Sequence, residues 1–171
     1  MTVPAIRTPS CNVLFLCTHN SARSILAEAA LNHIGAGRFK GYSAGSSPRA
    51  NQQPHPMALQ VLREAGIATE GLHSKNWDGF AAAGAPPMDL VITVCDNAAG
   101  EQCPYWPGHP ATAHWGYADP SEARGTDAQR LEAFRRTLLA IALRLDLLLA
   151  LPQGQVDKLA LQDKARALAS P

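Results

Sequence analysis

The sequence lacks a long hydrophobic run. Its most apolar stretch, residues 138–149, is too short to span a membrane and contains Arg144 and Asp146. Residues 1–10 lack the apolar core of a signal peptide, so we expect a flexible leader and a cytoplasmic protein. The formal net charge is only +1, so the composition favours neither nucleic acid nor another strongly charged partner.

The sequence also lacks the tight Cys-x2-Cys and His-x3-His pairs that structural zinc sites favour. In a reducing cytosol, cysteines are more often catalytic or metal-binding than joined in structural disulfides. A zinc site that uses two cysteines and two of three histidines is one alternative. The cysteines are Cys11, Cys17, Cys95 and Cys103; the zinc alternative uses Cys95 and Cys103 with two of His73, His109 and His114.

The chain is long enough for one domain with a buried core. It has 171 residues, of which 46% are hydrophobic and 17% are charged. We see no internal repeat and no linker long enough to divide it. We therefore expect a catalytic domain over 11–151 and a C-terminal extension over 152–171 that forms one amphipathic helix.

Strand-like and helix-like segments alternate along the chain. Strands are predicted over 12–16, 39–44, 88–94 and 111–115, and helices over 24–34, 54–65, 77–83 and 126–150. This order is typical of an α/β fold. We expect an open, mainly parallel four-stranded sheet flanked by helices on both faces, with ligands bound at the carboxyl ends of the strands.

A short polar loop joins the first predicted strand to the first predicted helix. Cys17 and Arg23 bracket it, and Ser24 follows directly. The N–H groups at a helix N-terminus bind oxyanions and lower the pKa of a nearby thiol, and a guanidinium can hold two oxygens at once. The pattern predicts a nucleophilic cysteine at the base of an oxyanion-binding loop; a buried structural cysteine is the simpler alternative. The predicted oxyanion-binding residues are Thr18, His19, Asn20, Ser21, Ala22 and Arg23.

An Asp-Pro pair follows the last predicted strand. Asp119 would lie in a loop whose backbone is restricted by Pro120. Its carboxyl group could protonate a leaving oxygen, which the attack of a thiolate on an oxyanion requires. An ordinary Asp-Pro turn is the alternative interpretation.

Cys95 follows the third predicted strand and therefore falls at the same edge of the sheet as Cys17. Seven polar or small residues separate it from Cys103. A reactive thiol with further thiols on a nearby loop is the arrangement that a thiol–disulfide relay needs. Two unreactive cysteines are the alternative.

Together these motifs resemble the low-molecular-weight protein tyrosine phosphatase family, and within it the arsenate reductases that are recycled by thioredoxin or a related thiol system. The additional cysteines point to the reductase branch, because a phosphatase needs only the loop and the aspartate. The resemblance extends from about residue 12 to residue 150. Its motifs are the loop Cys17–Ser24, Tyr42-Ser43-Ala44-Gly45, Val94-Cys95-Asp96 with Cys103-Pro104, and His114-Trp115-Gly116 ahead of Asp119-Pro120.

The resemblance implies an arsenate reductase that acts in arsenic detoxification. Cys17 would attack arsenate, Ser24 would tune the thiolate, and Asp119 would protonate the departing oxygen. Cys95 would then attack Cys17 and release arsenite, and Cys103 would attack Cys95. No metal or organic cofactor is required in this scheme. The reducing equivalents would come from thioredoxin, or from glutathione with glutaredoxin.

The sequence departs from the family pattern at three points, of which one is the tail beyond Leu151, absent from the shortest members. The two relay cysteines are separated by one residue more than in the best-known members, which leaves the final redox partner open. Some members also hold a potassium ion near the loop. Asn20, Glu28 and Ser43 match that pattern, whereas Asn76 stands where an acidic residue is expected.

Two other functions stay open from the sequence. A phosphatase acting on phosphotyrosine or small phosphoesters would share the first chemical step but would not need Cys95. A non-catalytic oxyanion sensor would bind phosphate or arsenate at Arg23 without turning it over.

Overall fold

The computed structural model of the chain describes residues 10–95, 106, 110–151 and 158–169. Four parallel strands form one sheet in the order β2-β1-β3-β4. This arrangement confirms the predicted open α/β sheet. The strands are β1 (Cys11–Cys17), β2 (Phe39–Gly45), β3 (Leu90–Thr93) and β4 (Ala111–His114).

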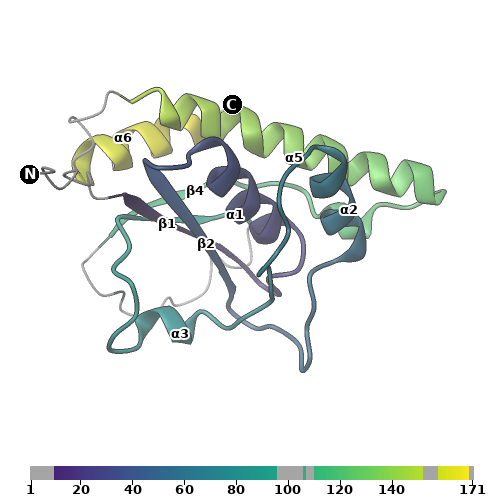
Figure 1. Ribbon diagram of the computed structural model, residues 1–171, viewed down its shortest axis with the longest axis horizontal. Coiled ribbons are helices and arrows are strands. Elements are labelled where there is room, and N and C mark those ends of the chain that lie inside the picture. The colour runs from purple at the N-terminus through teal and green to yellow at the C-terminus, as the bar shows by residue number, and fades with distance from the viewer. Residues whose placement is uncertain (1–9, 96–105, 107–109, 152–157, 170–171) are drawn as a thin grey trace, which may run out of the picture.

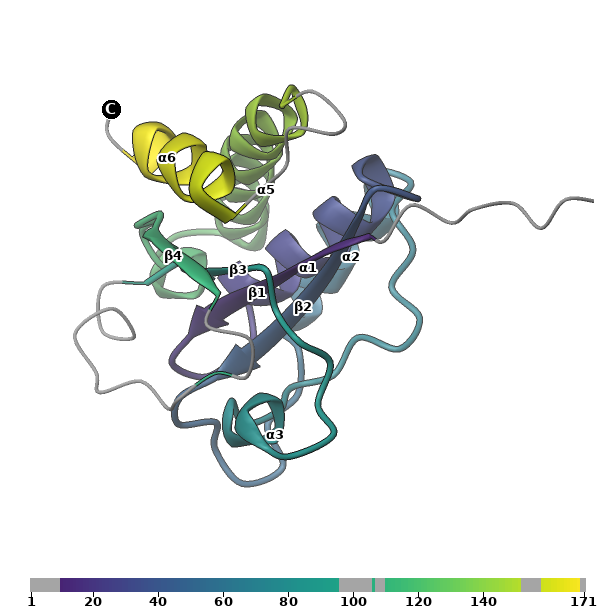
Figure 2. The ribbon, with the colours of Figure 1, turned by 90° about the vertical axis from the view of Figure 1, so that its left-hand side faces the viewer.

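Helices cover both faces of the sheet (Figure 1, Figure 2). Helices α1 (Arg23–Ile34), α2 (Pro56–Glu64) and α5 (Asp127–Leu149) lie on one face, and the short α3 (Asp78–Ala81) lies on the other. A single 3₁₀ turn, η1 (Pro120–Glu122), precedes α5. None of the helices in the described ranges is long and apolar enough to cross a membrane.

Strand β1 is central and is buried on both faces. Val13 and Phe15 belong to the core beneath α1, α2 and α5, whereas Leu14 and Leu16 belong to a second core on the face that carries α3. Successive side chains of a strand point to opposite faces of its sheet. Burial on both faces therefore explains the uninterrupted apolar run of residues 13–16.

Local sequence signals determine where two helices begin. The predicted start of α5 is confirmed by a capping box: Thr126 Oγ1 accepts the N–H of Gln129 at 3.2 Å, and Gln129 Oε1 accepts the N–H of Thr126 at 2.9 Å. Helix α2 was predicted from residue 54 but begins at Pro56. The residue before a proline is restricted to extended conformations, and His55 adopts one.

The C-terminal tail contains α6 (Lys158–Ala169), in the region where a helix was expected. It packs against β4, the edge strand of the sheet, and against α5. Trp115 Nε1 donates to the carbonyl of Ala165 at 2.8 Å, and Arg166 Nε donates to the carbonyl of Thr112 at 3.0 Å. The extension thus continues the helical layer beside α5 (Figure 2) and gives one carbonyl of the edge strand a hydrogen-bond donor.

Candidate active site

Cys17 is the last residue of β1 and is only 4% exposed. Its sulfur accepts the backbone N–H of Asn20 at 3.1 Å and lies 2.8 Å from the hydroxyl oxygen of Ser24. Arg23 begins α1, and the preceding Ala22 has only a methyl group, which cannot cap the helix. The first N–H groups of α1 therefore have no capping side chain from that residue and are available to an anion in the loop.

The pKa of the Cys17 thiol is raised above its ordinary value, mainly because the group is buried. The hydroxyl of Ser24 and the backbone amides of Asn20 and Ser24 lower it, but burial is the larger effect. The expectation of a lowered thiol pKa is therefore wrong.

Asn20 sets the direction of the hydrogen bond between Ser24 and Cys17. Its side-chain Nδ2 donates to Ser24 Oγ at 2.8 Å, and its Oδ1 accepts the backbone N–H of Lys75 at 2.9 Å. These two bonds define the orientation of the amide. The Ser24 oxygen accepts from Asn20 and keeps its own proton to donate to a Cys17 thiolate, which this bond would stabilise.

We expect Ser24→Ala to raise the pKa of Cys17 further, since the variant loses a donor that lowers it. Only the thiolate is alkylated, so alkylation by iodoacetamide near pH 8 should slow about threefold to tenfold. The measurement is the alkylation rate of Cys17 against pH, which in the wild type should still rise above pH 9.0, the ordinary pKa. Ser47→Ala, at an exposed position, is the matched control. A wild-type profile in Ser24→Ala would contradict this role for Ser24.

The end of β2 packs tightly against the loop at Gly45. A Cβ atom at this position would lie 2.6 Å from the carbonyl oxygen of Thr18 and 3.0 Å from the backbone nitrogen of Asn20. Only glycine allows this close approach of two backbone segments. The approach brings Ser43, two residues earlier, within 2.9 Å of Asn20 Nδ2. The Tyr42-Ser43-Ala44-Gly45 motif therefore supports the loop from below.

Arg23 and Asp119 form an ion pair across the mouth of the loop. Arg23 Nη2 lies 3.5 Å from Asp119 Oδ2, and Arg23 Nη1 donates to the carbonyl of Tyr117 at 2.8 Å. The other carboxylate oxygen of Asp119 accepts the N–H and the hydroxyl of Ser121 at 2.9 and 2.7 Å. The Asp-Pro loop thus holds a carboxyl group beside the anion-binding arginine.

Cys95 follows β3 and is buried beside the same loop. Its sulfur lies 3.6 Å from the hydroxyl oxygen of Thr18, the residue next to Cys17. The negative charge of a Cys95 thiolate raises the pKa of Cys17. The structure therefore brings together Cys17, Asp119 and Cys95, which lie on three different connections. Cys103 lies outside the described residues.

The zinc alternative has no support in the part of the chain that the structure describes, where no three metal-binding side chains gather. His73 Nδ1 contacts the carbonyl of Gly71 at 2.9 Å, and His114 Nδ1 contacts Thr93 Oγ1 at 2.7 Å. His109, like Cys103, lies outside the described residues. Cys11 lies at the opposite end of β1 from the loop, and burial, together with Asp89, raises its pKa to about 12.

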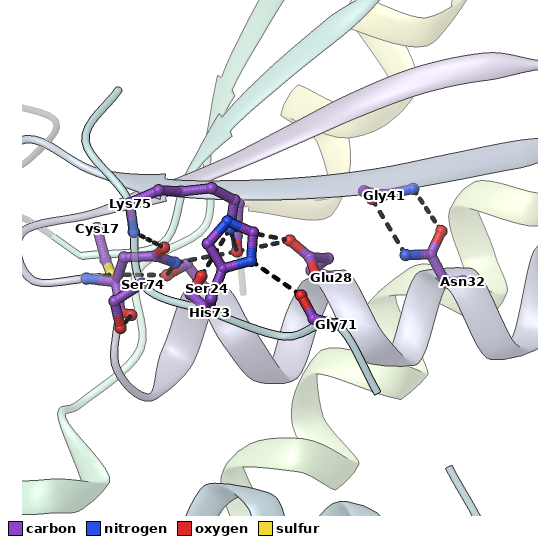
Figure 3. Close-up of polar contacts among 11 residues, drawn as sticks. Cys17, Ser24, Glu28, Asn32, Gly41, Gly71, His73, Ser74 and Lys75 are labelled. Carbon is purple, nitrogen blue, oxygen red and sulfur yellow. Dashed lines mark hydrogen bonds and ion pairs between the residues drawn. The ribbon is translucent and has the colours of Figure 1, made fainter. Parts of the chain in front are cut away.

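The three residues that match the potassium pattern lie together beneath the loop, with Ser74 and Lys75 beside them. Asn20, Glu28 and Ser43 are joined by hydrogen bonds. Lys75, which the sequence analysis did not single out, lies among them (Figure 3). Ser74, likewise missed, donates to the carbonyl of Asn20 at 2.6 Å. No local pattern marks the segment around Lys75, because it is held there by pairing with the end of β2.

Known proteins share this fold and its sequence pattern. The sequence profile of the low molecular weight phosphotyrosine protein phosphatase family matches residues 12–158. The arsenate reductase of Bacillus licheniformis is 39% identical over 125 residues, which cover 72% of this chain and 84% of the relative. A structure of an arsenate reductase in the phosphate binding state has a TM-score of 0.62 at 29% identity, covering 82% of this chain and 97% of that chain. The thioredoxin-dependent arsenate reductase of Corynebacterium glutamicum has a TM-score of 0.54 at 26% identity, covering 83% of this chain and 65% of that chain.

Proposed function

The chain belongs to the low molecular weight phosphotyrosine protein phosphatase family, and we propose that within this family it is an arsenate reductase of arsenic detoxification. The observation that carries this proposal is the buried thiol of Cys95 beside the loop, 3.6 Å from Thr18 Oγ1. Phosphate ester hydrolysis has no use for a second thiol, whereas reduction of arsenic(V) needs two electrons, one from each of two thiols. The similarity to arsenate reductases supports the same conclusion.

Binding begins when the oxyanion enters the loop. The backbone N–H groups of residues 18–23 and the guanidinium of Arg23 would hold its oxygens, as helix N-termini and arginines hold phosphates. Arg23 would exchange part of its contact with Asp119 for the ligand. The exchange frees the Asp119 carboxyl group to carry the proton that the reaction needs.

In the first chemical step, Cys17 replaces one oxygen of arsenate. The thiol proton passes to an arsenate oxygen, and the sulfur of Cys17 forms a bond to arsenic. The departing oxygen takes a second proton from Asp119 and leaves as water. The hydrogen bond from Ser24 stabilises the thiolate that forms on the way.

In the second step, the sulfur of Cys95 attacks the sulfur of Cys17. The arsenic–sulfur bond breaks, and its electron pair stays on arsenic, which leaves as arsenite after taking up a proton. The two cysteines have lost two electrons and are joined in a disulfide. Attack of Cys103 on Cys95 would then free Cys17 and produce a Cys95–Cys103 disulfide for an external reductant.

We propose that thioredoxin, or glutathione with glutaredoxin, supplies the electrons and that no metal or organic cofactor takes part. The similarity to a thioredoxin-dependent enzyme supports the first of these reductants. Thiol chemistry of this kind depends on a reducing compartment, so we expect the protein to act in the cytoplasm.

A single turnover without added reductant tests the proposed function. Fully reduced protein mixed with arsenate should form about one arsenite and lose about two thiols per chain. Cys11→Ser is the matched control and should give the same yields, because Cys11 lies away from the loop. A phosphatase or an oxyanion sensor would form no arsenite and keep all of its thiols.

A further inference from the structure

Lys75 places a partly buried ammonium group beneath the active-site loop (Figure 3). Its Nζ lies 3.6 Å from Glu28 Oε1 and 3.5 Å from Ser43 Oγ, and it donates to the carbonyl of His73 at 2.8 Å. The Lys75 side chain is 22% exposed, and that of Glu28 is 12% exposed. Burial lowers the pKa of Lys75, whereas the negative charges of Glu28 and Cys17 raise it. The pair is therefore a shielded cation and anion beside the nucleophile.

The Glu28 carboxylate begins a chain of hydrogen bonds that ends at the nucleophile. Glu28 Oε1 accepts the hydroxyl proton of Ser43 at 2.8 Å, and Ser43 Oγ accepts from Asn20 Nδ2 at 2.9 Å. The same amide group donates to Ser24 Oγ, which lies 2.8 Å from Cys17 Sγ. An ionised carboxylate can only accept, so Glu28 takes the Ser43 proton and leaves the Ser43 oxygen to accept from the Asn20 amide.

Glu28 needs a counter-charge to act in this way. Without one, the negative charge of Glu28 would repel both the oxyanion and a Cys17 thiolate.

The potassium ion that the family resemblance implies does not fit these residues. The oxygens of Glu28 and Ser43 that would bind it already face the ammonium group of Lys75, and a second cation there would be repelled. Asn76, at the position where an acidic residue is expected, uses its Oδ1 to accept the N–H of Asp78 at 2.8 Å.

We propose that Lys75 is a positioning residue that takes the place of a bound monovalent cation. Its ammonium group balances the negative charge of Glu28 and thereby favours both the oxyanion and the Cys17 thiolate in the loop above. The reaction of this protein consequently needs no added potassium. The inference rests on the proposed function only in taking Cys17 as the nucleophile.

The Lys75→Met variant tests this role, because it removes the charge and keeps the length of the side chain. Alkylation of Cys17 by iodoacetamide, followed by mass spectrometry of its peptide, should slow about threefold to tenfold near pH 8 and shift its pH profile upward. Ammonium or potassium chloride at about 0.1 M should restore most of the rate, compared with choline chloride at equal ionic strength. The wild-type rate should not respond to these cations.

Two further variants make the test specific. Glu28→Gln added to Lys75→Met should also restore the rate, since no buried carboxylate is then left to balance. Lys40→Met, which replaces an exposed lysine on β2, is the matched control and should behave like the wild type.

The inference is overturned if Lys75→Met keeps the wild-type profile, or if its shifted profile responds neither to the small cations nor to Glu28→Gln. A wild-type profile that moves with potassium also overturns it. Because alkylation does not involve arsenate, a failure of arsenate turnover alone counts against the proposed function and not against the role of Lys75.

Discussion

Cys17→Ser is expected to abolish both arsenate reduction and any phosphate ester hydrolysis, each by about four orders of magnitude or more. A serine hydroxyl is a far weaker nucleophile than a thiol and cannot supply the electrons that reduce arsenic. The loop amides and Arg23 are untouched, so the variant should still bind phosphate. The measurements are arsenite formed in a single turnover, hydrolysis of p-nitrophenyl phosphate, and phosphate binding by calorimetry.

The control for this variant is Cys11→Ser, which changes a cysteine at the opposite end of the same strand and should leave both activities intact. Circular dichroism should show the same fold in both variants. Arsenate turnover at the wild-type rate in Cys17→Ser would exclude Cys17 as the nucleophile. Loss of phosphate binding together with activity would mean that the loop had collapsed, and Cys17→Ala would then repeat the test.

The sheet could be predicted from the sequence because its signals are local. The run around Leu14 and Phe15 is apolar at every position, as a strand buried on both faces requires. Thr126 and Gln129 encode the start of α5 in four consecutive residues. Helix α2 was placed two residues too early, because a helical pattern of apolar residues says little about the turn that precedes it.

Only those site residues could be predicted that lie in one segment of the chain or at the same edge of the sheet. Cys17 and Arg23 lie in a single loop, and Asp119 follows a strand of the same parallel sheet, so their proximity follows from the fold class. Lys75 could not be found in this way, because it reaches Glu28 through a bridge between Gly45 and Asn76 that leaves no local pattern. The prediction of a lowered pKa for Cys17 was wrong for a related reason. The extent of burial, which raises this pKa, is a property of the packed protein and not of the loop sequence.

Cys95→Ser is expected to lose arsenate reduction and to keep phosphate ester hydrolysis. The variant keeps Cys17, Arg23 and Asp119, so hydrolysis of p-nitrophenyl phosphate should stay within about threefold of the wild type. Arsenite release without added reductant should fall at least about a hundredfold, because the thiol beside the loop that attacks the sulfur of Cys17 is missing. The serine hydroxyl can still contact Thr18, so the loss would reflect the missing sulfur and not a disturbed loop.

The amount of arsenic bound to Cys95→Ser shows whether the first step, attack of Cys17 on arsenate, still takes place. Cys95→Ser should retain about one arsenic per chain on Cys17 after gel filtration, and an external thiol such as glutathione should then release it as arsenite. Cys95→Ala should behave in the same way if the sulfur alone matters. Wild-type arsenite yield in either variant would show that Cys95 is dispensable, and the relay would have to begin at another cysteine. Retained hydrolysis with neither bound arsenic nor arsenite would identify the protein as a phosphatase.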